Sequence, residues 1–323
     1  MPLGCGGAEL GSKGCCVLEL EYWYWCTLHS SSSTTMIFWC AIALAVTIQT
    51  PQAASSSPSA SQALKQSARE MTLKLMKASQ RGDTEELSRF LSTSEVDPSA
   101  LGENGHRALT VAANNGQVDA AELLLAHGAR VDARGKNALT ALHVASSQGH
   151  LAMVETLCAH GASVDAISDS HGYSPLMFAA HAGHASLVPT LLRHGSRVEG
   201  ANRMLYTALH VAAFGGHADV VAALLDVGAD TALRGRDGLA PLHLAAMAGY
   251  TAVAELLLSR GAEVEAKSKE GHTPLHLAVQ KQHEGLTRQL LHAGDDGHPS
   301  ACTRVRPSAI RVPPECHPSG TST

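Results

Sequence analysis

The chain has 323 residues, of which 45% are apolar and 16% are charged, and its formal net charge is −5. The apolar fraction is enough to build a buried core, so the composition excludes disorder throughout the chain. The negative net charge provides no overall basic surface for nucleic acid. Aromatic residues make up only 4%, a composition that suits short helices packed closely together.

Residues 1–70 differ from the rest of the chain. Five of the eight cysteines lie in the first forty residues, and residues 36–48 are almost wholly apolar. This stretch is shorter than the ~20 residues that span a bilayer, but it matches the apolar part of a secretory signal. The residues before it carry three Glu and one Lys, whereas a signal needs positive charge. Two interpretations stay open: a signal or anchor, and a poorly ordered leader that ends in a flexible Ser/Ala-rich linker at residues 55–67.

The middle of the chain repeats one phrase with a constant period. The phrase has the form Thr-Pro-Leu-His-Val-Ala, and its copies begin at Arg107, Thr140, Ser174, Thr207, Ala240 and Thr273, spaced 33, 34, 33, 33 and 33 residues apart. A second phrase, a Leu pair followed by Gly, recurs with the same spacings and ends at Gly128, Gly161, Gly195, Gly228, Gly261 and Gly294. Two independent phrases on one period indicate a repeat architecture.

These residues resemble the ankyrin repeat, a 33-residue unit with the signature T-P-L-H-x-A. The resemblance covers residues 105–294 in six clear repeats, and a divergent copy at 73–96 extends it toward the linker. It implies an all-α solenoid of stacked helix-turn-helix units with finger-like loops, flanked by poorly ordered tails. We therefore expect a leader at 1–70, an ankyrin-repeat domain at 71–295 and a Pro-rich tail at 296–323.

Local chemistry agrees with helix pairs. Thr or Ser at the start of most copies can cap a helix through its hydroxyl, and Pro at the next position costs no hydrogen bond there. Gly116, Gly149, Gly183, Gly216 and Gly249 are expected to end the first helix of each pair. Ala138 and Leu205 stand where the other units have a turn Gly, so those two junctions are expected to be less regular.

The sequence contains no complete motif for catalysis or metal binding. His143, His210, His243 and His276 share one repeat position, and His150, His184 and His217 share another. Residues that repeat with the architecture are expected to serve it, here through hydrogen bonds between neighbouring loops and helices. His181 and His184 have the spacing of a metal pair, but no further ligands are placed to complete a site. We predict no cofactor, no metal and no enzymatic activity.

Cationic residues recur in the expected finger loops. Lys136, Arg203, Arg236 and Lys269 lie four residues before the helix starts, with Ser170 in the same register, and Arg134, Arg234 and Lys267 lie two residues earlier. Tyr173 and Tyr206 are expected at finger tips. In ankyrin-like arrays the partner usually meets these loops and the concave face of the first helices, where His181, Phe214 and Met247 fall. The two interpretations of the cations are a solvated loop edge and a binding site for an acidic segment of a partner protein.

The resemblance implies a non-enzymatic protein-protein interaction module, a cytoplasmic adaptor or scaffold that binds another protein and no small-molecule substrate. Nucleic acid is a weaker partner, because no aromatic ladder accompanies the cations. A second hypothesis is a membrane-anchored or exported ankyrin protein, with membrane contact only through residues 36–48. A third is a targeting or regulatory subunit of an enzyme complex. Ligase adaptors of this family carry a further C-terminal helical box, for which the Pro-rich tail shows no pattern.

Overall fold

The computed structural model describes residues 60–93, 96–102 and 104–295. They form fourteen α-helices and one short 3₁₀ helix, and they include no β-strand. The helices are α3 (Ala60–Arg81), α4 (Thr84–Ser92), α5 (Ala108–Asn114), α6 (Val118–Ala126), α7 (Ala141–Gln148), α8 (Leu151–Ala159), α9 (Pro175–Ala182), α10 (Leu187–Arg193), α11 (Ala208–Gly215), α12 (Ala218–Asp226), α13 (Pro241–Ala248), α14 (Thr251–Ser259), α15 (Pro274–Gln280) and α16 (Glu284–Asp295). The 3₁₀ helix η1 covers Lys136–Ala138.

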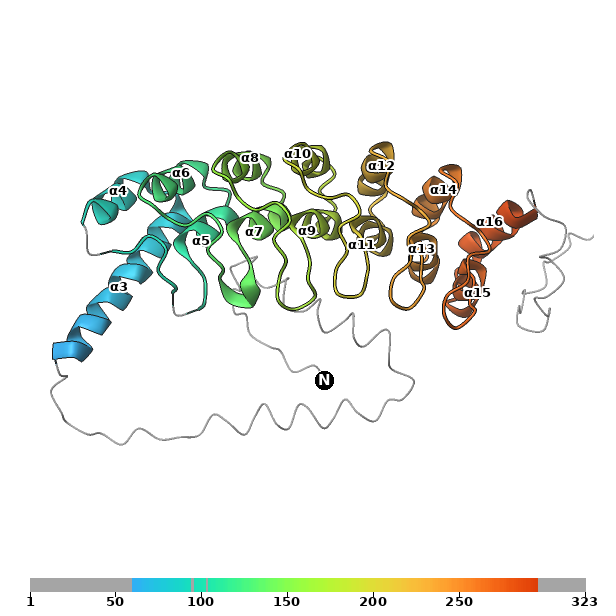
Figure 1. Cartoon of the computed structure of the whole chain (residues 1–323), viewed down its shortest axis with the longest axis horizontal. Coiled ribbons are helices and arrows are strands. Elements are labelled where there is room, and N and C mark those ends of the chain that lie inside the picture. Colours follow the sequence, from blue (N-terminus) through green and yellow to red (C-terminus); the bar gives the residue numbers. More distant parts are fainter. Residues whose placement is uncertain (1–59, 94–95, 103, 296–323) are drawn as a thin grey trace, which may run out of the picture. The chain divides into compact units, whose positions relative to one another are not determined.

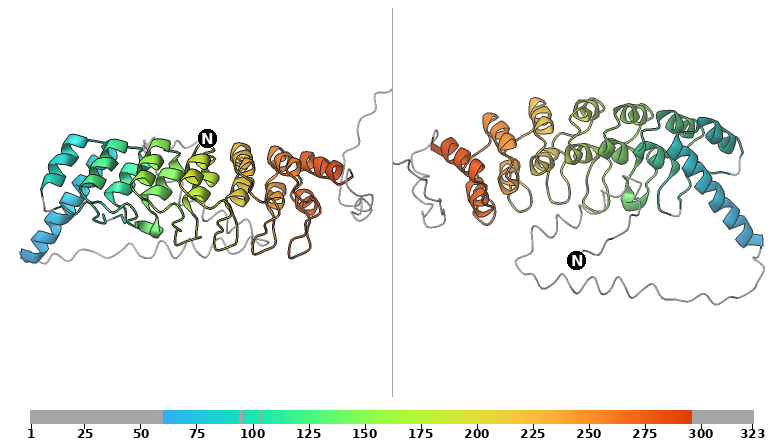
Figure 2. Two further views of the ribbon diagram at one scale, coloured as in Figure 1. Left: turned by 45° about the horizontal axis from the view of Figure 1, so that its top comes forward. Right: turned by 180° about the vertical axis from the view of Figure 1, so that it is seen from behind.

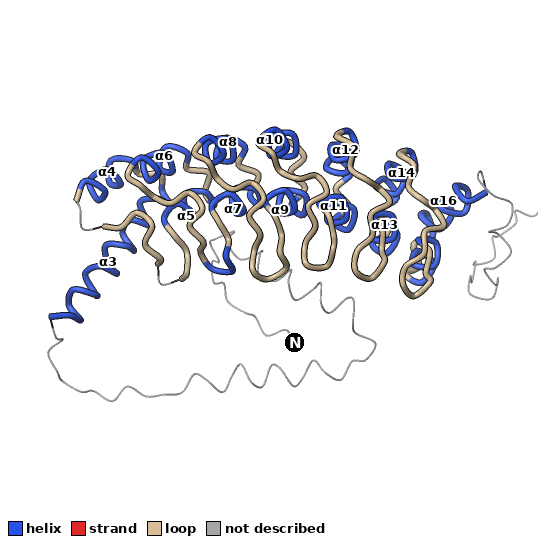
Figure 3. The backbone as a smooth tube through the Cα atoms, viewed as in Figure 1, coloured by secondary structure: helices blue, strands red, loops and turns tan. Residues whose placement is uncertain are grey.

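The helices lie in two parallel rows of antiparallel pairs. The odd-numbered helices α3 to α15 pack side by side in one row, and the even-numbered helices α4 to α16 do so in the other. Figure 1 shows the two rows, and Figure 2 shows the same order from two other sides. Long loops that join consecutive pairs project on the side of the odd-numbered row (Figure 3). Each pair contacts mainly its neighbours, as expected of a solenoid.

The core runs continuously between the two rows. The Leu of the repeated phrase is buried in the odd-numbered helices, at Leu109, Leu142, Leu176, Leu209 and Leu242, and the Ala three residues later is fully buried at Ala112, Ala145, Ala179, Ala212 and Ala245. The small Ala side chains let neighbouring helices approach, while Leu124, Leu157, Leu191, Leu224 and Leu257 fill the space from the other row. A single pair could not bury this surface alone, so stacking supplies the stability.

The expected starts and ends of the helices are present. Ser174 Oγ accepts a hydrogen bond from Met177 N at 3.4 Å and Pro175 follows at the first helical position of α9. Gly183 ends α9 with a φ of 81°, in the left-handed region that glycine enters most easily. In the last repeat Gln282 stands at the corresponding position and takes the same conformation, with a φ of 63°.

Helix α3 corrects one expectation. It begins at Ala60, so the second half of the segment predicted as a flexible linker is helical. Ala, Gln, Leu, Lys, Arg, Glu and Met, which are strong helix formers, make up most of α3, and they outweigh the Ser content on which the linker prediction depended. No described helix has the length and hydropathy needed to cross a bilayer. The apolar stretch at 36–48 and the tail at 296–323 lie outside the described residues.

Candidate functional site

Six finger loops join the helix pairs, and each is closed by a backbone hydrogen bond at its base. We number them first to sixth: residues 101–106, 134–139, 167–173, 201–206, 234–239 and 267–272. The closing bonds run from Gly102 N to His106 O, Gly135 N to Leu139 O, Ser168 N to Tyr173 O, Asn202 N to Tyr206 O, Gly235 N to Leu239 O and Ser268 N to His272 O, at 2.8–3.0 Å. The loops are therefore built as hairpin-like turns of fixed shape.

A second set of backbone hydrogen bonds joins each finger to the one before it. The donors are the amides of Lys136, Asp169, Arg203, Arg236 and Lys269, and the acceptors are the carbonyls of Gly105, Asn137, His171, Met204 and Asp237, at 2.7–3.1 Å. The five donor residues therefore occupy equivalent places along the finger edge. Four of them are cationic, as the sequence predicted.

The third finger departs from the register that was predicted for it. It has one residue more between its closing groups than the other fingers, because Ser168 pairs with Tyr173. The residue equivalent to Lys136 and Arg203 is consequently Asp169 and not Ser170, and Ile167 takes the place equivalent to Arg134. A carboxylate and an exposed apolar side chain thus separate Arg134 and Lys136 from the cations of the later fingers.

The cations of the fourth to sixth fingers are exposed. These three loops contain five cations and two carboxylates, so their net charge is positive although that of the whole chain is −5. Arg234 is partly engaged, because it donates to Lys267 O at 2.6 Å and pairs with Glu263 at 3.1 Å. Among the described residues no carboxylate is within ion-pair distance of Arg203, Arg236, Lys267 or Lys269.

The first histidine series ties helix starts to the next finger. In the first member of the series, His143, Nδ1 accepts a hydrogen bond from Thr140 N at 3.2 Å, and Nε2 lies 2.9 Å from Ala166 O and 3.1 Å from Tyr173 O. A ring whose Nδ1 accepts carries its proton on Nε2 and can donate it to those carbonyls. His210 and His243 repeat the arrangement. Burial lowers the pKa of His143 and of His210 to about 4, and it also lowers that of His243.

The second histidine series reaches back to the preceding repeat. Nε2 of His150, His184, His217 and His283 lies 2.8–3.2 Å from the carbonyls of Asn114, Ser147, His181 and Met247, respectively. Each ring also covers the Gly that ends the preceding odd-numbered helix, and a Cβ at Gly183 would lie only 2.7 Å from His217 Nδ1. The prediction that the repeated histidines form hydrogen bonds between repeats is confirmed for six of the seven predicted residues; among the described residues, His276 forms its hydrogen bonds with Thr273 of its own repeat. Among the described residues no group of three or more His, Cys, Asp or Glu side chains could hold a metal ion.

Comparison with known proteins identifies the family. A model of ankyrin repeats in three copies matches residues 75–168, 165–235 and 228–299. The chain belongs to the ankyrin-repeat family. Among solved structures, the ankyrin-repeat domain of human ASB11 matches with a TM-score of 0.62 and 29% identity, over 68% of this chain and 96% of that one. No curated protein sequence matches this chain. Ankyrin repeats are generally protein-interaction modules, typically without enzymatic activity, and the family match is to no catalytic family.

Tyr206 is not an exposed finger-tip residue of this ankyrin array, and that expectation is wrong. Its side chain is 2% exposed, its ring stacks on that of His210 with the ring centroids 5.2 Å apart, and its hydroxyl donates a hydrogen bond to the Asp237 carboxylate. Tyr173 is half-buried, with its ring edge-on to Phe178 at 5.8 Å. The ring of Tyr173 thus packs on an apolar neighbour, whereas the ring of Tyr206 packs on His210, and its bond to Asp237 ties the fourth finger to the fifth.

The expected concave-face residues occupy one place in successive repeats. His181, Phe214 and Met247 lie in the last turn of α9, α11 and α13, and all three are half-buried. Burial, together with the neighbouring charge of His217, lowers the pKa of His181. Because they are half-buried, these three side chains expose a smaller fraction of their surface than the cations of the fingers.

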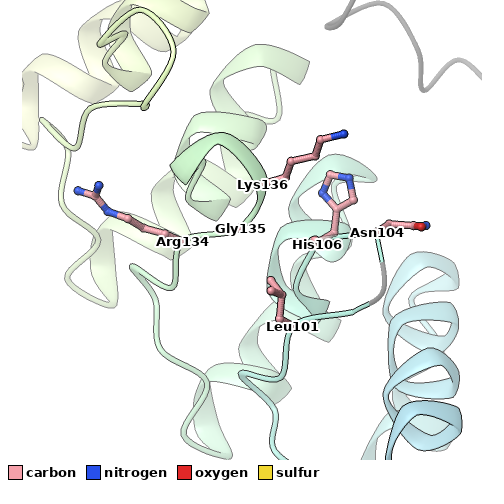
Figure 4. A pocket seen from close by; sticks show the side chains of 7 residues that line it. Leu101, Asn104, His106, Arg134, Gly135 and Lys136 are labelled. Atoms are coloured by element: carbon pink, nitrogen blue, oxygen red, sulfur yellow. The ribbon is translucent and has the colours of Figure 1, made fainter. Parts of the chain in front are cut away.

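A broad, open hollow lies between the first and second fingers. It has a volume of about 660 Å³ and is lined by Leu101, Asn104, Gly105, His106, Arg134, Gly135 and Lys136. Lys136 extends over the same side as His106, whereas Arg134 points away from it (Figure 4). Sequence analysis found the two cations but missed Leu101 and His106. Leu101 could have been found, because it lies 33 residues before Arg134, at the same place one repeat earlier.

Proposed function

We propose that this ankyrin-repeat protein is a cytoplasmic adaptor or scaffold that binds an acidic segment of another protein along its finger edge. The observation that carries the proposal is the cationic edge of the fourth to sixth fingers. The bonds between fingers hold Arg203, Arg236 and Lys269 in register at the surface. Surface cations at a regular spacing favour carboxylates presented by an extended segment, through complementary charge.

The rest of the array supports this assignment through its rigidity. A finger that is closed at its base and bonded to its neighbour loses little freedom when a partner binds, so less of the interaction free energy is spent on ordering. Binding through exposed charges is also expected to weaken as salt rises. The fourth to sixth fingers lie within the repeat domain at 71–295, which would supply the whole surface.

The test is charge reversal in the full-length chain. We expect the triple variant Arg203→Glu, Arg236→Glu, Lys269→Glu to retain fewer partner proteins in affinity capture, because it replaces attraction by repulsion at three adjacent fingers. Its thermal unfolding midpoint should change little, because all three side chains are exposed. Lys77→Glu combined with Arg288→Glu is the control for charge reversal away from the fingers, since these exposed cations lie on α3 and α16.

Equal capture by the wild type and the triple variant would contradict the proposal and leave the cations as a solvated edge. The cytoplasmic assignment has its own test. Fractionation of a C-terminally tagged full-length chain should match that of a chain lacking residues 1–54. A shift from membranes to the soluble fraction on deletion would instead favour the anchored or exported protein.

A further inference from the structure

The tip of the fourth finger carries two exposed apolar side chains next to the cations. Leu205 is 51% exposed and Met204 is 37% exposed. Arg203 precedes them in the chain, and Arg236 N donates to Met204 O at 2.8 Å. Leu205 also has a φ of +61°, in the left-handed region. The finger thus presents an apolar tip beside positive charge.

Leu205 is an unfavourable residue for this backbone position. The equivalent residue is Gly105, Gly172, Gly238 and Gly271 in four other fingers and Ala138 in the second, all with positive φ. A side chain in this conformation brings its Cβ close to the carbonyl oxygen, a steric cost that glycine avoids. Leu205 recovers little of that cost by burial, because half of its surface is exposed. A strained residue that does not stabilise its own chain indicates a function, such as contact with a partner.

The tip is held rigidly in place. Asn202, which is buried, accepts hydrogen bonds on Oδ1 from the amides of Met204 and Tyr206, both at 2.9 Å. Leu205 N donates to Asn202 O at 2.9 Å and completes the turn. The buried Tyr206 then fixes this finger to Asp237 of the next one. Two apolar side chains on such a rigid turn need little ordering when they enter a contact.

We infer that Met204 and Leu205 are the apolar anchor of the finger edge, and that they bind a protein segment in which large apolar side chains are flanked by carboxylates. The inference rests on the proposed function and names the chemistry of its partner. Charge complementarity selects this partner, because Arg203 precedes Met204 in the chain and the amide of Arg236 donates to Met204 O, so two cations lie beside the apolar tip. An acidic segment without apolar residues would leave Met204 and Leu205 without a contact.

The experiment measures binding of fluorescein-labelled peptides to the full-length chain by anisotropy. The first probe alternates Leu or Phe with pairs of Glu, the second has Ser in place of Leu and Phe, and the third has Lys in place of Glu. We expect the first to bind at least about tenfold more tightly than the second, as loss of a buried apolar side chain implies. We expect Leu205→Gly to reduce that difference, with Met204 still in place, while its urea midpoint stays the same or rises.

Ala138→Gly is the matched control, because it relieves a positive φ at the equivalent position without removing an exposed apolar side chain. It should keep the preference for the first peptide. Equal binding of the first and second peptides, or an unchanged preference in Leu205→Gly, would overturn the apolar anchor and leave the acidic-partner function standing. Equal binding of the Lys peptide, or no binding of any peptide, would overturn both.

Discussion

Acid should destabilise the array through its buried histidines. Burial lowers the pKa of His143 and of His210 to about 4, whereas the unfolded value is about 6.5. Above pH 6.5 both states are neutral, so the full contribution to stability is present. As the pH falls from 6.5 to 4 the unfolded chain binds protons that the folded chain does not, and stability is lost. Between pH 7 and pH 5 each histidine is expected to cost about 2 kcal/mol.

Several contacts of His143 contribute to its lowered pKa. For His143, burial is the largest influence and the charge of Arg134 acts in the same direction, while the carbonyls of Tyr173 and Ala166 and the charge of Asp132 oppose it. Protonation would also place a second proton on Nδ1, which accepts from Thr140 N. The folded state therefore resists protonation at Nδ1.

The assay compares urea unfolding of the full-length wild type and His143→Gln from pH 7 to pH 5, followed by circular dichroism. Gln is uncharged at every pH and can still accept from the helix start, so the variant should be less stable at pH 7 but lose about 2 kcal/mol less on acidification. His160→Gln, at an exposed position after α8, should follow the wild type. Parallel curves for the wild type and His143→Gln would refute the reasoning.

Two further predictions concern contacts between repeats. Gly183→Ala should lower the free energy of unfolding by at least about 1–2 kcal/mol, because the added Cβ lies at positive φ and meets the ring of His217. The control variant Gly285→Ala should be neutral or stabilising, because its Cβ would have room within α16. Equal urea midpoints for the two variants would contradict this. Tyr206→Phe should cost about 1–2 kcal/mol, because the Asp237 carboxylate loses a buried donor, and an unchanged midpoint would show that the hydroxyl contributes nothing.

The sequence alone determined the repeat, its period and the helix pairs. Capping residues, helix-ending glycines and Leu/Ala stripes act over a few residues, so their consequences can be predicted from local chemistry. The recurrence of histidine with that period also predicted its structural role, since a side chain that serves every interface must appear in every unit.

Only the tertiary structure decided which finger residues face solvent. The ring of Tyr206 is buried, and its hydroxyl donates to the Asp237 carboxylate of the next finger. Asp169 stands in the cation register because the third finger has one residue more between its closing groups. Leu205 became significant only when its exposure and positive φ were seen together. The first of these features depends on a contact between residues 31 apart in the chain, and the other two depend on the conformation of single fingers, which the repeated phrase does not specify.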